Sequence, residues 1–196
     1  MRLLVIGPAA LAPDASGDAA RERALFAQLD DDAFAAPSQA ACRENLIELV
    51  ARAASAGIRV VIVTDQAGPV DLRLDNIDVG PLVTAHLEVV RPRNARVGEF
   101  WNFRRRLLAL RGYIAERDNR IVSRVVFVDS GVKDEAGRNL SSKFLVNLGL
   151  DAELVDPGPW GLALGSYAQI CAALELDVPS PRPTTSRASN NDEELF

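Results

Sequence analysis

Two acids, Asp129 and Asp134, are the side chains whose type and spacing best suit chemistry. Asp129 directly follows the apolar run 125–128, which is typical of a buried parallel strand, and Asp134 stands where a helical stretch begins. Open α/β sheets bind ligands where strands end, and carboxylates are ligands that Mg²⁺ prefers. We therefore expect a ligand or divalent-metal site at Asp129 and Asp134, with help from Asp65 after another strand.

A simpler role is open to Asp134 and fits Asp129 less well. Asp134 could be only a helix N-cap, accepting hydrogen bonds from the first backbone N–H groups of the helix. Asp129 follows four apolar residues and must find hydrogen bonds or a cation to offset its desolvation.

The basic segment 91–111 is the second candidate site, because it holds seven arginines and only one acid, Glu99. Aromatic residues are interleaved with the arginines, so the segment offers both phosphate-pairing groups and rings that stack on bases. The residues predicted to bind a polyanion such as nucleic acid are Arg93, Arg96, Arg104, Arg105, Arg106 and Trp101. The alternative is an amphipathic helix whose aromatic side chains enter the core while its arginines remain solvated.

Strands and helices alternate along the chain and must position these residues. Strands are expected at 2–6, 58–63, 83–90, 124–128 and 152–155, and helices at 18–29, 38–56, 97–116, 135–148 and 161–174. Residues 67–80 are expected to form a loop. This alternation predicts an α/β fold, a three-layer Rossmann-like and mostly parallel sheet of about five strands.

Length and composition predict one domain with a tail. The chain has 196 residues, of which 48% are hydrophobic, enough for one core over residues 1–177. Residues 178–196 are rich in Pro, Ser and Asn and are expected to be a disordered acidic tail. No window approaches the roughly 20 apolar residues that span a bilayer, so we expect a cytoplasmic protein with no membrane partner. Cys42 and Cys171 are expected to be buried thiols.

Several of these motifs, in this order, resemble the haloacid dehalogenase (HAD-like) superfamily of phosphohydrolases over about residues 1–175. The strand that ends at Thr64 resembles the family's second motif, and the resemblance implies that Thr64 binds phosphate. Arg91, followed by Pro92, resembles the family's Lys-Pro element with Arg in place of Lys, which implies a second phosphate contact. Asp129 and Asp134 resemble the paired acids that hold magnesium. The interval between the first two expected strands is too short for a large inserted cap domain. In this respect the chain resembles capless members of the superfamily, such as polynucleotide 3′-phosphatases.

The family's nucleophile motif is missing from this chain. The family has Asp-x-Asp directly after the first strand, where this sequence has Gly7 and Ala9. Asp14 and Asp18 lie further along the loop and would be catalytic only if the first loop were misread. We therefore expect a pseudo-phosphatase that binds Mg²⁺ weakly and a phosphorylated ligand, nucleic acid or protein partner non-catalytically. The alternative is a Mg²⁺-dependent phosphatase acting on phosphoesters or nucleic-acid ends.

The last five residues, DEELF, loosely resemble the acidic, Phe-terminated ends of bacterial and phage single-stranded-DNA-binding proteins. Those ends dock on partner proteins, so the resemblance implies a protein partner for the tail. A further alternative is therefore a replication or repair accessory protein that uses the basic segment and the tail. A charged, disordered end without a partner would give the same sequence.

Overall fold

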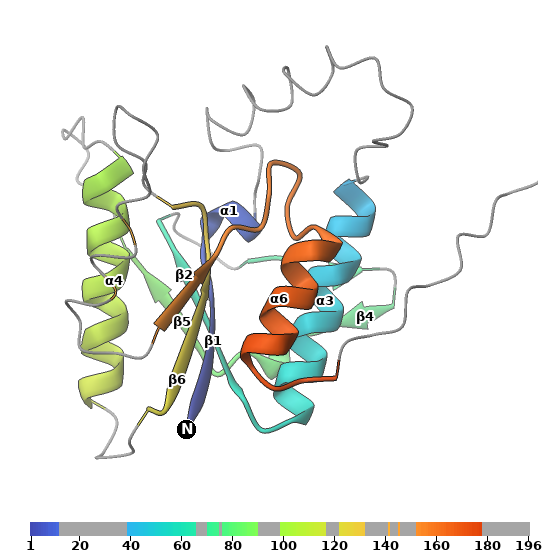
Figure 1. Ribbon diagram of the computed structural model, residues 1–196, viewed down its shortest axis with the longest axis horizontal. Helices are drawn as coiled ribbons and strands as arrows, with labels where there is room; N and C mark the ends of the chain where they lie inside the picture. Colours follow the sequence, from blue (N-terminus) through green and yellow to red (C-terminus); the bar gives the residue numbers. More distant parts are fainter. Residues whose placement is uncertain are drawn as a thin grey trace, which may run out of the picture.

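A parallel five-stranded sheet forms the centre of the protein (Figure 1). The computed structural model describes residues 1–11, 39–65, 70–74, 76–89, 99–116, 122–131, 141, 145 and 152–177. In sheet order the strands are β5 (Ala85–Glu88), β2 (Arg59–Thr64), β1 (Arg2–Ile6), β6 (Arg124–Val128) and β7 (Ala152–Val155). The expected α/β fold with a Rossmann-like, mostly parallel sheet is confirmed.

The central strands are apolar along their length because both of their faces are covered. Leu4 of β1 pairs in register with Val60 of β2 and Val126 of β6, and all three side chains lie in one hydrophobic cluster. The neighbouring Leu3 and Val5 belong to a second cluster. Since successive side chains in a strand point to opposite faces, these clusters are the two cores of the molecule.

Helices cover both faces of the sheet and give three layers. α3 (Gln39–Ser55) and α6 (Leu164–Ala173) pack side by side on one face, and α4 (Glu99–Glu116) lies on the other (Figure 1). α3 is followed by Gly57, whose φ of 69° is the left-handed conformation that commonly ends a helix. The expected helices at 38–56, 97–116 and 161–174 correspond to α3, α4 and α6.

Two short features differ from the expectation. The stretch expected to be a loop contains an antiparallel hairpin of β3 (Arg73–Leu74) and β4 (Ile77–Asp78), followed by a 3₁₀ turn, η2 (Gly80–Leu82). Beside β3, Leu72 is buried in the core that α3 covers, which gives this hairpin its place. A one-turn helix, α1 (Pro8–Leu11), directly follows the first strand.

Some expectations lie outside the described residues. They concern the helix at 18–29, the tail 178–196 and most of the helix ending at residue 148. Of that last helix, Ser141 and Leu145 are described as helical and buried. No helix in the described ranges is long and apolar enough to cross a membrane.

Candidate functional site

The carboxyl ends of β1 and β6 form the point at which strand order reverses. From β1 the chain continues to β2 and β5 on one side, and β6 then returns to the other side of β1. Such a switch point is where open α/β sheets bind ligands. Here Gly7 follows β1 and Asp129 follows β6. The Gly7 N–H donates to the Val128 carbonyl at 2.8 Å, which holds the two strand ends together.

Asp129 is buried at this point, with 1% of the residue exposed. Its Oδ1 atom accepts hydrogen bonds from the backbone N–H groups of Ala9, at 3.2 Å, and Ser130, at 3.0 Å. Its Oδ2 atom lies 2.8 Å from a guanidinium nitrogen of Arg106 and forms an ion pair without hydrogen-bond alignment. The buried acid, expected to need hydrogen bonds or a cation, thus has both, and the cation is an arginine of the same chain.

Arg106 comes from the sheet-facing side of α4. It lies three residues after Phe103 and four before Leu110, both buried, so helical spacing places it on the apolar face. Its guanidinium carbon is 5.7 Å from the centre of the Phe103 ring, which stacks on Phe127 of β6. Arg106 therefore lies apart from the exposed arginines of α4, because its side chain is only 10% exposed. The binding of a polyanion by Arg106 stays a prediction.

Gly7 leaves the space that the Asp129 carboxylate fills. A Cβ atom built on Gly7 would lie 2.6 Å from the Oδ2 atom of Asp129 and would overlap its Cγ atom. Any side chain at this position would therefore require Asp129 or the backbone to move. The carboxylate of Asp129 can therefore pack at the end of β1 because Gly7 has no side chain.

Burial raises the pKa of the Asp129 carboxyl above its ordinary value, because desolvation disfavours the charged form. Arg106 and the backbone N–H groups of Ala9 and Ser130 act in the opposite direction and offset part of this rise. The ion pair therefore compensates for burial rather than adding a large net stabilisation.

A magnesium ion would have to replace Arg106 in order to bind Asp129 in this conformation. Both Asp129 oxygens face donors of the chain, and a guanidinium already supplies the positive charge. Within the described residues, no group of three Asp, Glu, His or Cys side chains could hold a metal ion. Asp65 follows β2 and is half-buried, and Asp134 lies outside the described residues. The described residues alone do not form a magnesium site, and weak magnesium binding stays a prediction.

The other predicted site residues are divided between the described and undescribed parts. Thr64 ends β2 beside β1 and is buried, with 5% exposed. Its carbonyl accepts a hydrogen bond from the Val89 N–H at 2.7 Å, which extends the pairing of β2 with β5. Outside the described residues lie Asp14, Asp18, Arg91, Arg93, Arg96 and Asp134.

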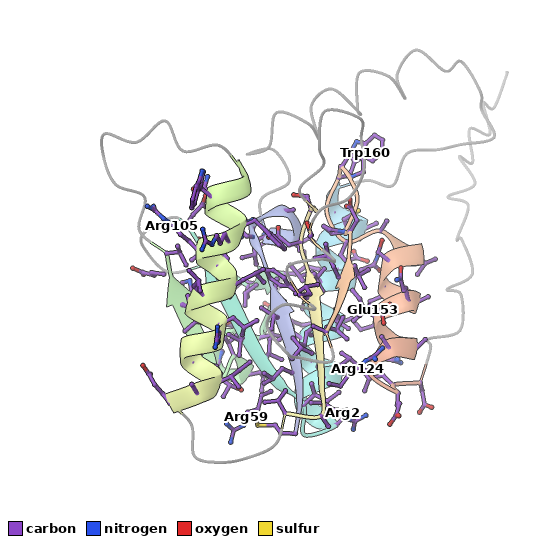
Figure 2. The ribbon with its side chains drawn as sticks, turned by 60° about the vertical axis from the view of Figure 1, so that its left-hand side comes forward. Arg2, Arg59, Arg105, Arg124, Glu153 and Trp160 are labelled. Atoms are coloured by element: carbon purple, nitrogen blue, oxygen red, sulfur yellow. The ribbon has the colours of Figure 1, made fainter. Side chains whose placement is uncertain are left out.

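The outer face of α4 carries the described part of the basic segment. Trp101 is 49% exposed and Leu108 is 50% exposed. The Arg104 guanidinium lies 5.2 Å from the centre of the Trp101 ring, a cation–π contact. Arg104 and Arg111 are exposed, and Figure 2 shows Arg105 on the side of α4 away from the sheet. We call Trp101, Arg104, Arg105, Leu108 and Arg111 the outer α4 face.

No family model, curated protein or solved structure matches this chain, so its membership of the HAD-like superfamily stays a prediction.

Proposed function

We propose that this chain is a non-catalytic α/β domain that binds single-stranded nucleic acid on the outer α4 face. The observation that carries the non-catalytic part is the packing of Gly7 against the Asp129 carboxylate. If the resemblance to HAD-like phosphohydrolases holds, a nucleophilic acid would have to occupy the position of Gly7. The carboxylate of Asp129 fills that space, and Arg106 neutralises it.

The outer α4 face supports the binding part of the proposal. Arg104, Arg105 and Arg111 can pair with phosphates, while the half-exposed ring of Trp101 can stack on a base. The protein has a net charge of −5, so a polyanion would approach favourably only where positive side chains gather. The contact between Arg104 and Trp101 holds a phosphate-pairing group beside a stacking surface.

Binding of a labelled oligothymidylate, measured by fluorescence anisotropy at low salt, tests this surface. We expect Arg104→Gln and Arg105→Gln each to weaken binding severalfold and to reduce the salt dependence by about 0.7 per lost phosphate contact. Trp101→Ala should weaken binding through lost stacking. Arg73→Gln removes the same charge from an exposed side chain of β3 and is the matched control, expected to bind as the wild type does.

Two results would contradict this proposal. If Arg73→Gln weakened binding as much as Arg104→Gln, attraction would follow overall charge rather than the outer α4 face. If no binding occurred at low salt, the nucleic-acid part would be wrong, and a protein partner would become the better explanation of the exposed Trp101 and Leu108.

Hydrolysis assays test the non-catalytic part separately. With Mg²⁺ present, we expect no turnover of generic phosphoesters or of 3′-phosphorylated oligonucleotides. Turnover that disappears in Asp14→Asn or Asp18→Asn would show that the first loop supplies a nucleophile, and it would establish the phosphatase alternative. Oligonucleotide binding and hydrolysis are measured independently, so either part of the proposal can fail alone.

A further inference from the structure

A pocket lies at the amino end of the sheet, opposite to the switch point. Its volume is about 690 Å³, and the residues around it include Arg2, Gly57, Ser123, Arg124, Ala173 and Glu175. This volume falls within the range of pockets that hold small molecules. The lining combines the first residues of β1 and β6 with the last residues of α6 and the segments that follow α3 and α6.

Two arginines stand side by side in this pocket. Arg2 of β1 and Arg124 of β6 are direct partners in the parallel register, so their side chains point to the same face of the sheet. That face is the one α6 covers (Figure 2). Like charges in such neighbouring positions repel each other unless anions lie nearby. Arg124 has an anion in Glu153, at 2.8 Å.

The anion beside Arg2 is Glu175, and its contact is looser. Its Oε2 atom lies 3.4 Å from an Arg2 nitrogen, and the Glu175 side chain is 86% exposed. Arg2 also donates a hydrogen bond to the Leu174 carbonyl at the end of α6. An exposed ion pair of this kind contributes little stability and exchanges readily with solvent. A dissolved anion could therefore take the place of the Glu175 carboxylate.

Glu175 occupies a backbone position that does not favour glutamate. Its φ of 55° lies in the left-handed region, and within the described residues it alone has a positive φ without being glycine. It also follows the carboxyl end of α6, where the helix dipole disfavours a negative charge. The backbone conformation favours glycine at this position, and the helix dipole disfavours an acid. The contact that glutamate adds at this position is the one between its carboxylate and Arg2.

We propose that the pocket binds the phosphate group of a small phosphorylated molecule through Arg2 and Arg124. Glu175 is then an intramolecular competitor that covers Arg2 when the ligand is absent. Two arginines in paired register positions suit a phosphate dianion because the guanidinium group of each can donate charge-assisted hydrogen bonds to its oxygens. This inference does not rest on nucleic-acid binding, since the outer α4 face lies on the opposite side of the sheet.

Isothermal titration of the full chain with inorganic phosphate tests the proposal, with sodium chloride of matched ionic strength as the reference. Glu175→Gln removes the competing charge and keeps the side-chain length, so we expect phosphate to bind about two- to fivefold more tightly. Arg124→Gln should weaken binding about tenfold or more, because a charged hydrogen-bond donor is lost.

Arg59→Gln is the matched control. Arg59 also begins a strand at this end of the sheet, but it pairs in register with Leu3, so its side chain points to the α4 face (Figure 2). We expect this variant to bind phosphate as the wild type does. Equal loss in Arg59→Gln and Arg124→Gln, unchanged binding in Arg124→Gln, or no binding even by Glu175→Gln would each overturn the proposal. Arg104→Gln, which tests the outer α4 face, should leave phosphate binding unchanged.

Discussion

The Oδ2 atom of Asp129 lies 2.8 Å from a guanidinium nitrogen of Arg106, and this ion pair joins α4 to the end of β6. Both side chains are almost fully buried, at 1% and 10% exposure. Neither can exchange its partner for water without a local rearrangement. The ion pair therefore couples the packing of α4 on the sheet to the position of the Asp129 carboxylate at the carboxyl ends of β1 and β6.

Replacing Arg106 with methionine should destabilise the protein at neutral pH by about 3–5 kcal/mol, because Asp129 is left buried without its cation. Adding Asp129→Asn to this variant should recover a large part of the loss, since the buried charge is then absent. Denaturant unfolding of the single and double variants measures both effects. A double variant no more stable than Arg106→Met would show that Arg106 contributes through packing rather than by compensating Asp129.

The raised pKa of Asp129 determines the direction in which its contribution to the free energy of unfolding changes with pH. Because the folded state holds this proton more tightly than the unfolded state, the contribution of Asp129 is greatest below the ordinary carboxyl pKa. It is lost as pH rises through the folded pKa. The free energy of unfolding of the wild type, measured relative to Asp129→Asn, should therefore fall as pH rises from acid toward neutral. A difference that increases with pH would mean that Arg106 outweighs the effect of burial.

Two glycine-to-alanine substitutions should change stability in opposite directions. Gly7→Ala places a methyl group against Asp129, and we expect a loss of about 1–3 kcal/mol from overpacking. Gly112 lies within α4, and apart from its chain neighbours and the backbone of its own helix, a Cβ atom there would meet nothing within 4 Å. Gly112→Ala should therefore stabilise the protein by about 0.5–1 kcal/mol through helix propensity. Thermal unfolding of both variants checks these signs, and a stabilising Gly7→Ala would contradict the packing described for the switch point.

Deleting residues 190–196 should strengthen binding to single-stranded nucleic acid. These residues carry three acids, Asp192, Glu193 and Glu194, and a tethered acidic segment competes for the outer α4 face at high effective concentration. Added salt should weaken binding by both forms because counterions are released on association. Anisotropy titrations of the two forms measure the difference. A neutral replacement of the three acids should act like the deletion if charge is the cause, and equal affinity in all forms would exclude competition by the tail.

The sequence identified the main strands because each is a short apolar run bounded by polar residues. The runs that begin at Arg2 and Arg124 form strands with the expected bounds. The hairpin of β3 and β4 was missed because strands of two residues are too short to show an alternating pattern. Its position depends on the burial of Leu72 against distant residues, which no local pattern records.

The candidate site was only partly accessible from the sequence. The sequence predicts that Asp129 needs hydrogen bonds or a cation, because it follows a buried strand. That Arg106 is the cation depends on how α4 crosses the sheet, which the sequence does not show. A local signal for burial was present, since Arg106 is spaced with Phe103 and Leu110 on one side of the helix. The sequence predicts the loss of a nucleophile at Gly7, but it does not show the contact of Gly7 with Asp129, because that contact depends on the pairing of β1 with β6.

The position of β1 in the middle of the sheet has a consequence for how the protein folds. Its partners are far away along the chain: Leu3 pairs with Arg59 on one side, and Arg2 pairs with Arg124 on the other. Contacts between such distant residues require large loops to close before they add stability, and parallel sheets with this connectivity fold slowly. We expect β1 to remain unpaired on its β6 side until late in folding, so that a transient apolar strand edge makes this step sensitive to protein concentration.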